Sequence, residues 1–508
     1  MRLSRKIIKK IPKQSGLAIP SEDLFLLPEK VLQFGTGALL RGLPDYFIDK
    51  ANRNRLFNGR IVVVKSTSNG SADAFDLQDG LYTLCVRGVE NGTHAEETII
   101  NSSISRVLSA RKDWKTILQC AHDPEMKIII SNTTEVGIVL TQDEIHLAPP
   151  HSFPGKLLAF LYERYKAFYG REDSGMVIIP TELIVDNGSN LRSIVLELAT
   201  INKLEEKFIQ WLQFANYFCN SLVDRIVPGK LSETDKKNAE EKFGYRDELM
   251  IMAETFCLWV IESDNERIKE ILSFSNADEG VVITPGIEKF RELKLRVLNG
   301  THTFSCGLAF LAGFDTVKEA MRNEEISLYI RRLMLLEIAP ALDSDTISYN
   351  EACAFANQVM DRFRNPFIDH HWISITLNYT SKMRLRNVPL LLRHYSKTDE
   401  IPESMALGFA GYLLFMKCQK GSDGLYYGCT NGSKYAIQDD MAAYFADKWT
   451  ISNMDTFVND ILADKEIWGT DISRLNSFAE AVKENLQLLE KQGVLATLAE
   501  KQIKKTEA

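Results

Sequence analysis

The feature that most constrains the fold is a short apolar run that leads directly into a glycine turn and then into a helical pattern. Residues 30–34, KVLQF, predict a buried strand, and Gly35-Thr36-Gly37 follows at once. Across residues 38–53 apolar side chains recur about every four positions, as on one face of a helix. This order opens a dinucleotide-binding unit, in which glycines let the backbone approach a pyrophosphate and the helix start offers free amides.

The glycine turn matches the usual GxGxxG pattern imperfectly. Leu40 stands at the third glycine position, and Gly42 comes two residues later. A purely structural turn is therefore the alternative when this motif is taken alone. If the unit binds a dinucleotide, we expect the contacts in and around the turn, at Gln33, Phe34, Gly35, Thr36, Gly37, Ala38, Leu39, Leu40 and Arg41.

Further apolar runs have the continuous β-branched character of strands buried on both faces of a parallel sheet. They lie at residues 60–66, 127–138 and 176–184. Asn132 and Thr133 fall where such a strand ends, the edge at which doubly wound sheets bind ligands, so we expect both to contact the cofactor. Residues 78–88 and 97–108 are predicted to form an inserted β excursion.

The end of the second predicted strand leaves the choice between NAD and NADP open. In NAD sites an acidic residue near this point holds the ribose hydroxyls. Here the strand ends Val64-Lys65-Ser66-Thr67, with no acid before Asp73. Lys65 could instead favour a 2′-phosphate.

The character of the sequence changes after Thr284-Pro285-Gly286, where strand patterns nearly vanish and helical periodicity dominates. We therefore predict an α/β protein with a Rossmann-like dinucleotide-binding domain over residues 28–283 and an all-helical C-terminal domain over 284–508. A basic N-terminal extension, residues 1–27, begins with MRLSRKIIKKIPK. It is expected to be disordered or to lie on the surface.

Residues 288–313 predict a buried helix that carries three polar side chains on one side. At 100° per residue, Lys294, Asn299 and His302 project at about 0°, 140° and 80°. Transfer of a hydride from an alcohol to a nicotinamide needs a base for the hydroxyl proton and donors for the developing oxyanion. A lysine acts as base only when neutral, a form that burial and nearby positive charge favour.

These three residues are therefore predicted as a lysine general acid/base with an amide and an imidazole that polarise the C–O bond. The alternative is structural. Lys294 would reach solvent, Asn299-Gly300 would form a kink, and His302 would be a satisfied core histidine.

Composition excludes several classes of protein. The 508 residues carry a net charge of −8 and are 45% hydrophobic and 25% charged, as in a soluble globular protein with no general attraction to nucleic acid or membranes. No apolar run approaches the roughly 18–20 residues of a membrane span. The N-terminus lacks the apolar core of a secretory signal. The cysteines are scattered and expected to be reduced, as in a cytosolic protein, so a cytoplasmic location is expected. Neither the cysteines nor the histidines are spaced like metal ligands, so no metal site is expected.

Several of these motifs together resemble one enzyme family. KLRVLNGTH, a K-x4-N-x2-H pattern, resembles the catalytic helix of the polyol-specific long-chain dehydrogenases, the mannitol dehydrogenase family. GTGALLR resembles that family's GxGxFxR cofactor turn, with Leu39 in place of its aromatic residue, and SLVDRIVP at 221–228 resembles its VDRI signature. Residues 362–386 resemble the segment that closes over the substrate and supplies a second lysine, here Lys382.

The resemblance extends from about residue 30 to residue 495, and the turn TELIVDNG at 181–188 departs from it. Family members acting on mannitol or fructuronate usually have C-D-N-x-P-x-N-G there, so the asparagine of their oxyanion hole falls on Leu183. That leaves Asn187 or Glu182 as the stand-in. The resemblance implies Lys294, Asn299, His302, Lys382 and Asn187 as catalytic residues, NAD as cofactor and no metal.

Within the family the likeness is greatest to members that act on sugar acids. A substrate carboxylate should meet a cation, and Lys382, Arg384 and Arg386 are the candidates, although a solvated basic patch would explain the two arginines equally. The expected partner is a small sugar-acid molecule, with no nucleic acid or membrane, and a monomer is favoured. The alternatives are a family member that acts on fructuronate or mannitol, a non-catalytic nucleotide-binding regulatory protein, and a SAM-dependent methyltransferase, whose glycine-rich first turn looks similar.

Overall fold

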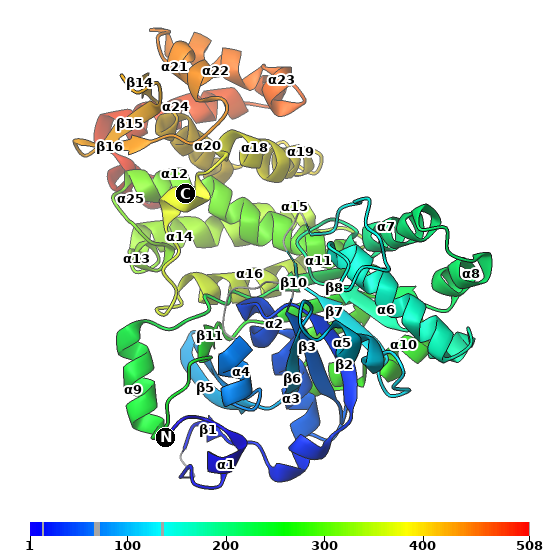
Figure 1. The fold of residues 1–508 in the computed structure, drawn as a ribbon. Coiled ribbons are helices and arrows are strands. Elements are labelled where there is room, and N and C mark those ends of the chain that lie inside the picture. Colours follow the sequence, from blue (N-terminus) through cyan, green and yellow to red (C-terminus); the bar gives the residue numbers. More distant parts are fainter. Residues whose placement is uncertain (13–14, 66–71, 134–136, 507–508) are drawn as a thin grey trace. The chain divides into compact units, whose positions relative to one another are not determined.

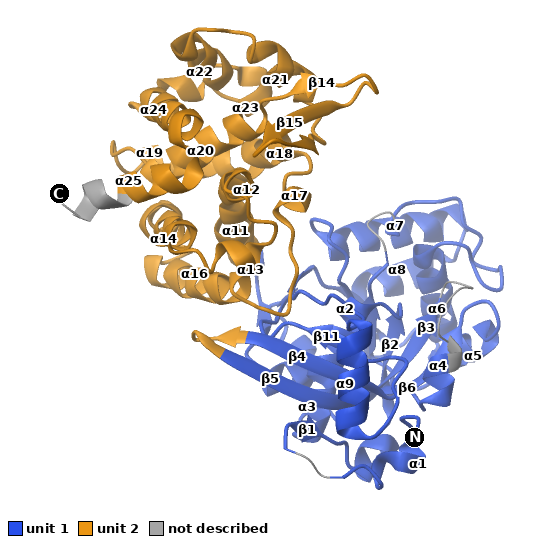
Figure 2. Cartoon of the chain, turned by 90° about the vertical axis from the view of Figure 1, so that its left-hand side faces the viewer, with its two compact units in different colours: residues 1–88, 94–287 blue, residues 89–93, 288–508 orange. Residues whose placement is uncertain are grey.

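The computed structural model describes residues 1–12, 15–65, 72–133 and 137–506 (Figure 1). The chain forms two compact units, each described here by itself. Unit 1 comprises residues 1–88 and 94–287, and unit 2 comprises residues 89–93 and 288–508 (Figure 2). Among the described residues no helix has the length and apolar character needed to cross a membrane.

The central sheet of unit 1 has the strand order of a dinucleotide-binding domain. Six parallel strands lie in the order β6-β3-β2-β7-β8-β9. They are β2 (Glu29–Phe34), β3 (Arg60–Lys65), β6 (Ile104–Ser109), β7 (Ile128–Ser131), β8 (Val177–Pro180) and β9 (Tyr217–Phe218). Numbered along the chain this is 3-2-1-4-5-6, which reverses direction between β2 and β7. The predicted strands that begin at residues 30, 60, 127 and 176 are all present.

Two smaller sheets complete the β structure of unit 1. One has the order β1-β5-β4-β11, the other β10-β12-β13. Their strands are β1 (Leu17–Ala18), β4 (Tyr82–Glu90), β5 (Thr93–Asn101), β11 (Ile251–Ala253), β10 (Ser221–Asp224), β12 (Leu258–Glu262) and β13 (Val281–Thr284). The prediction of one inserted β excursion over 78–108 was partly wrong, because β6 pairs with β3 in the central sheet.

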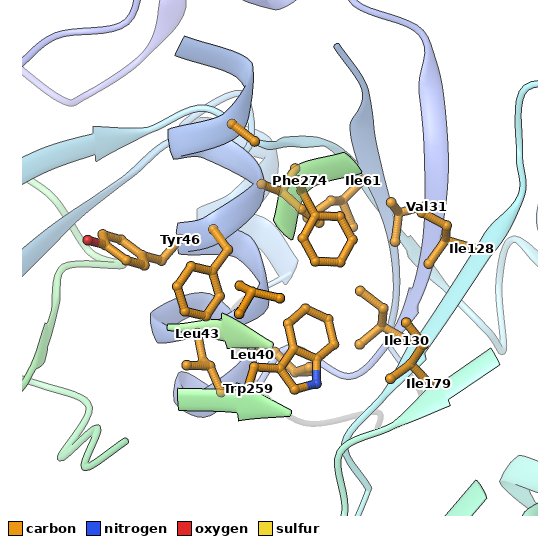
Figure 3. Packing of buried hydrophobic residues seen from close by; sticks show 14 of the residues in the cluster. Val31, Leu40, Leu43, Tyr46, Ile61, Ile128, Ile130, Ile179, Trp259 and Phe274 are labelled. Atoms are coloured by element: carbon orange, nitrogen blue, oxygen red, sulfur yellow. The ribbon is translucent and has the colours of Figure 1, made fainter. Parts of the chain in front are cut away.

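Side chains from both faces of the central sheet enter separate apolar cores. Val31, Ile128 and Ile130 pack with Trp259 and Phe274 on one face (Figure 3). Their strand neighbours Leu32 and Ile129 belong to the other core. Since successive strand residues point to opposite faces, burial of both faces explains the uninterrupted β-branched runs.

The longest helices of unit 1 are α6 and α7, with 15 residues each. The helices of this unit are α1 (Arg5–Ile8), η1 (Glu22–Leu26), α2 (Ala38–Gly42), α3 (Pro44–Arg53), α4 (Ala72–Leu77), α5 (Trp114–Cys120), α6 (Phe153–Ala167), η2 (Glu172–Ser174), α7 (Asn187–Ile201), α8 (Glu206–Phe214), α9 (Glu233–Phe243), α10 (Glu266–Ile271) and η3 (Ser273–Ala277).

The N-terminal extension is built into unit 1, which corrects the prediction of a disordered or surface arm. Leu3 is fully buried, and its backbone N–H donates to Arg246 O at 2.9 Å. Ile8 and Ile11 are also buried, in a core that includes Phe243 of α9. The basic residues masked this pattern, because the apolar side chains between them have no regular period.

Unit 2 is mainly helical. Its helices are α11 (Glu288–Leu293), η4 (Lys294–Gly300), α12 (Thr301–Leu311), α13 (Val317–Ala320), α14 (Glu324–Arg332), η5 (Leu333–Ile338), α15 (Ala339–Leu342), α16 (Tyr349–Phe363), α17 (Trp372–Ile375), α18 (Tyr379–Lys382), η6 (Met383–Asn387), α19 (Val388–Tyr395), α20 (Glu403–Phe415), α21 (Ala442–Lys448), α22 (Met454–Leu462), α23 (Lys465–Trp468), η7 (Ile472–Arg474), α24 (Phe478–Gln492) and α25 (Val494–Thr506).

The expectation of an all-helical second domain was wrong in one detail. A three-stranded antiparallel sheet consists of β14 (Gln419–Lys420), β15 (Tyr426–Thr430) and β16 (Ser433–Ala436). Asn431 and Gly432, both with positive φ, form the two-residue turn between β15 and β16. This dipeptide is a strong hairpin signal in a sequence, and it was overlooked.

Three segments of unit 2 are π-helical, namely η4, η5 and η6. The predicted helix at 288–313 is therefore α11, η4 and α12 in succession and has no single period. In a π-helix the hydrogen bond joins residue i to residue i+5, which widens the turn, and such segments occur often at functional sites.

A buried carboxyl group lies beneath the glycine turn of unit 1. Asp45 on α3 is fully buried, and neither carboxylate oxygen has a hydrogen-bond partner among the described residues. Burial raises the pKa of Asp45 to about 8, and the charge of Arg41 offsets only part of this. One turn later Asp49 is equally buried but accepts bonds from Ser102 N and Oγ and from Arg53 Nε.

We predict that Asp45→Asn removes a pH-dependent loss of stability. The folded protein keeps this proton up to about pH 8, whereas an unfolded chain releases it near 3.8. Between these values unfolding releases a proton, so rising pH favours the unfolded state by at most about 1.4 kcal/mol per pH unit. The measurement is urea unfolding at several values from about pH 5 to about pH 8. The free energy of unfolding of Asp45→Asn should rise relative to that of the wild type as the pH rises.

Asp49→Asn is the matched control for this measurement. It breaks a fully partnered carboxylate and should lower the free energy of unfolding without the same gain at high pH. A constant difference between Asp45→Asn and wild type across this window would contradict the prediction.

Candidate functional site

The glycine turn lies at the point where the strand order reverses. Gly35, directly after β2, has φ +129°, and a side chain there would meet Leu40 at 2.8 Å and the carbonyl oxygen of Asn132 at 3.0 Å. Glycine at this position therefore allows close approach of β2 and the end of β7. At Gly37 an added Cβ would have no atom within 4 Å. A closed turn with an open outer face fits the cradle of a pyrophosphate.

The displaced third glycine has a packing role. A Cβ on Gly42 would meet the side chain of Val227 at 2.9 Å. Arg225 Nη1 donates to Gly42 O at 2.6 Å, and Arg225 Nε donates to Glu254 O at 2.9 Å. The VDRI segment thus supports the helix that follows the glycine turn, a role that its sequence did not reveal.

The nine residues predicted around the turn divide by exposure. Gln33, Phe34 and Leu40 are buried and shape the turn from below, whereas Gly37 is exposed. Thr36, Ala38 and Leu39 are partly exposed. The side chain of Arg41 is held inside unit 1, because Nη1 donates to Leu249 O at 2.6 Å and the guanidinium lies 5.4 Å from the Tyr82 ring centre.

The ends of β7 and β8 are joined by a buried carboxylate that sequence reasoning underrated. Glu182 accepts bonds from Ser131 Oγ at 3.2 Å and from Thr133 N and Oγ1 at 2.8 and 3.0 Å. Asn132 Nδ2 donates to Thr181 O and Oγ1, both at 3.0 Å. Asn132 and Thr133, predicted to contact the cofactor, therefore also connect the two strand ends.

Two parts of the predicted cofactor region lie outside the described residues. They are Ser66 and Thr67 after β3, and residues 134–136 after β7. Lys65, the last residue of β3, is buried.

Asn187 has a structural role, which corrects its expected place in an oxyanion hole. Its Nδ2 donates to Pro180 O and Glu182 O at 3.0 Å and lies 3.2 Å from Ser221 O. Its Oδ1 accepts from the backbone N–H groups of Gly188 and Ser221, both at 2.9 Å. An amide with both hydrogens engaged has no donor left for a substrate oxygen.

The polar residues of unit 2 begin on the π-helical segment. Lys294 and Asn299 are the first and sixth residues of η4, and both are half-buried. Regular α-helical geometry places them about 140° apart. The i to i+5 pattern of η4 instead places Asn299 nearly above Lys294. The π segment therefore gives the two residues a smaller angular separation along the helix than the sequence period suggested.

His302 is a buried residue of α12, the helix that follows η4. Its ring stacks on Phe363 at 4.1 Å between centres and meets the rings of His370 and Trp372 edge-on at 5.0 and 5.8 Å. Burial first, and then the charges of His370, Arg362, Arg386 and Lys382, hold the pKa of His302 well below its ordinary value. The imidazole is therefore neutral at physiological pH. Its Nδ1 is buried and has no partner within the described part of the chain.

Lys382 lies at the end of α18, just before the third π segment, η6. Its Nζ donates to Ile375 O at 2.8 Å. Burial, followed by the charge of Arg386, lowers the pKa of Lys382 from its ordinary value. The structure therefore gathers Lys382, Arg386 and His302 in one neighbourhood, as the resemblance implied for the lysine and the histidine.

Arg296, which sequence reasoning missed, links the π segments η4 and η6. It lies on η4, is 7% exposed, and its Nη1 donates to Leu385 O at 2.7 Å and to Arg386 O at 2.8 Å. Its remaining nitrogens contact Glu292 at 3.3 and 3.4 Å. Glu292 also pairs with Arg393 of α19 at 2.7 Å. One guanidinium therefore binds carbonyl groups in the segment that carries Arg386.

Among the described residues no group of three or more His, Cys, Asp or Glu side chains is arranged to hold a metal ion.

Comparison with known proteins identifies the family. The Mannitol dehydrogenase Rossmann domain matches residues 29–272, and the Mannitol dehydrogenase C-terminal domain matches residues 286–490. The chain belongs to the mannitol dehydrogenase family. It is an oxidoreductase of that family, a dehydrogenase acting on a CH–OH group. The resemblance stated from the motifs, and the α/β plus helical fold class, are confirmed.

Individual relatives cover nearly the whole chain. A protein named altronate oxidoreductase from Halalkalibacterium halodurans is 36% identical over 92% of this chain and 92% of its own length. The protein of the same name from Bacillus subtilis is 37% identical over 93% of this chain and 95% of its own.

Two solved structures share the fold. D-sorbitol dehydrogenase in substrate-free form has a TM-score of 0.78 and 19% identity, covering 98% of this chain and 100% of its own. Pseudomonas fluorescens mannitol 2-dehydrogenase, in a ternary complex with NAD and D-mannitol, has a TM-score of 0.64 and 23% identity, covering 98% and 99%.

We predict that Arg296→Met destabilises the protein and weakens substrate handling. The apolar stem is kept, but two carbonyl groups lose their donor, which costs about 1–3 kcal/mol each when they stay buried. The midpoint of urea unfolding should fall, and KM should rise because Arg386 and Lys382 are less well positioned.

The control for this prediction is Arg474→Met, which removes an arginine that is 80% exposed and paired with Asp471. Exposed pairs of this kind contribute about 0–1 kcal/mol. Equal effects of the two substitutions on the unfolding midpoint would refute the role given to Arg296.

Proposed function

We propose that this protein is an NAD-dependent altronate oxidoreductase that interconverts D-altronate and D-tagaturonate in hexuronate (galacturonate) catabolism. The observation that carries this proposal is the set of Lys294, Asn299 and His302 on η4 and α12, in a chain whose relatives named altronate oxidoreductase align over more than nine-tenths of its length. The domain limits proposed are 28–283 for the dinucleotide and 284–508 for substrate and catalysis. We also propose a cytoplasmic location.

The dinucleotide is assigned to the turn at Gly35–Gly37. The close approach at Gly35 and the open face at Gly37 support this assignment. The bound nicotinamide supplies the acceptor or donor of a hydride. The residues of this chain hold it, orient the substrate and move one proton.

Lys294 is the proposed general acid and base. In oxidation its neutral amine removes the proton from the substrate hydroxyl, and in reduction its ammonium returns a proton to the carbonyl oxygen. Asn299 donates an amide N–H to the same oxygen. His302, neutral because of its buried and cationic surroundings, donates a ring N–H without adding another charge. Lys382 is proposed to contact the substrate as well.

The substrate assignment is tested by NADH oxidation with a panel of tagaturonate, fructuronate and fructose, repeated with NADPH. We expect tagaturonate with NADH to give the highest kcat/KM. Turnover of fructuronate or fructose without tagaturonate would instead favour the related members of the family. A complete lack of turnover, with retained NADH binding, would favour a regulatory nucleotide-binding protein.

Lys294→Ala should lower kcat by about 10²–10⁴-fold, the usual contribution of a general acid or base, with little change in NADH affinity. Lys289→Ala is the matched control, because Lys289 lies on α11 just before η4 and its ion pair is with Glu351. Full activity of Lys294→Ala would show that another group moves the proton.

A further inference from the structure

The side chain of Arg386 points from η6 toward the residues that surround the proposed catalytic groups. Its Nη1 donates to Thr303 Oγ1 at 3.2 Å, and Thr303 Oγ1 in turn donates to Asn299 O at 2.7 Å. Thr303 directly follows His302 on α12. The hydroxyl group of Thr303 thus connects the Arg386 guanidinium to the backbone carbonyl group of Asn299. Arg386 itself is half-buried.

Four basic side chains lie around His302 and define a basic cluster of Arg362, His370, Lys382 and Arg386. All four act on the imidazole of His302 and help to lower its pKa. Lys382 and Arg362 likewise help to lower the pKa of His370, and Arg386 that of Lys382. Lys382 and Arg386 carry like charges that repel each other, and partial burial strengthens the repulsion.

Two acidic side chains in this part of unit 2, Asp439 and Asp369, have other partners. Asp439 acts on Lys382, but its carboxylate accepts bonds from Thr380 N and Oγ1. Asp369, beside His370 in sequence, pairs with Lys318 at 2.6 Å. Both carboxylates are therefore hydrogen-bonded or paired with groups outside the basic cluster.

Arg386 is better suited than Arg384 to bind an anion in this region. Arg384 is exposed, and its Nη1 contacts Glu466 O at 3.3 Å. Arg386 uses one N–H for Thr303, the single side-chain bond of this guanidinium recorded within the described residues. A guanidinium has five N–H groups in a planar fork that matches a carboxylate.

We propose that Arg386, supported by the basic cluster, binds the carboxylate of the substrate and so selects sugar acids over uncharged sugars. This inference rests on the proposed function and adds the group that recognises the substrate. The buried Nδ1 of His302 has no partner in the described part of the chain, and Arg386 is one of the charges that act on this imidazole. A bound carboxylate would offset the positive charge of Arg386 and accept hydrogen bonds from its remaining N–H groups.

The test compares two unreactive or slow ligands that differ in charge, gluconate and glucitol, as competitors of the preferred substrate. Gluconate has a carboxylate where glucitol has a hydroxymethyl group. For the wild type we expect gluconate to bind more tightly than glucitol. Arg386→Gln should remove this difference and lower kcat/KM for tagaturonate by about 10²–10³-fold, mainly through KM. Arg386→Lys, which keeps the charge, should restore part of the preference.

Arg384→Gln is the matched control, because it removes an exposed arginine two residues away and should leave the preference for gluconate unchanged. Circular dichroism and NADH affinity show whether Arg386→Gln remains folded. Equal weakening of gluconate and glucitol by Arg386→Gln, or a selective effect of Arg384→Gln, would overturn the inference.

This design separates the inference from the proposed function. If the wild type does not reduce tagaturonate, the proposed substrate is wrong, yet a gluconate preference lost in Arg386→Gln would still support carboxylate binding. If the wild type reduces tagaturonate but shows no gluconate preference, the substrate stands and the role of Arg386 falls.

Discussion

The architecture of unit 1 depends on a close backbone approach where the strand order reverses. Gly35 follows β2 and lies so near to the carbonyl group of Asn132 and the side chain of Leu40 that a Cβ there would clash. Around this contact Glu182 binds the ends of β7 and β8, and Arg225 holds the end of α2. Parallel strands with both faces buried leave their carboxyl ends as the accessible edge, so the polar residues of unit 1 collect there.

Unit 2 relies on a different device, the interruption of regular helices. η4 and η6 both depart from α-helical hydrogen bonding and carry or adjoin the residues of the proposed chemistry. The wider turns of η4 change the angle between Lys294 and Asn299 from that of a regular α-helix. Arg296 supplies donors to two backbone carbonyl groups of η6. The buried side chain of Arg296 thus connects the two irregular segments η4 and η6.

Charge gives this region its chemical character. His302 stays neutral because it is buried among cations, and Lys382 and Arg386 lie close enough to affect each other. A ligand of opposite charge beside Lys382 and Arg386 would offset their mutual repulsion. An oxyanion formed during hydride transfer and a substrate carboxylate would both be stabilised by these surroundings.

The sequence by itself determined the strands, the glycine turn, the helical character of unit 2 and the presence of Lys294, Asn299 and His302. Burial on both faces and local backbone requirements leave direct traces in residue type and spacing, so these features could be predicted. The ordered N-terminal segment, the turn role of Asn187 and the link through Arg296 were decided by the tertiary structure. Each depends on hydrogen bonds or packing between residues distant in sequence, which have no period along the chain. The relation of Lys294 to Asn299 belongs to the same class, because a sequence period assumes a regular helix and the hydrogen bonding of η4 is not regular.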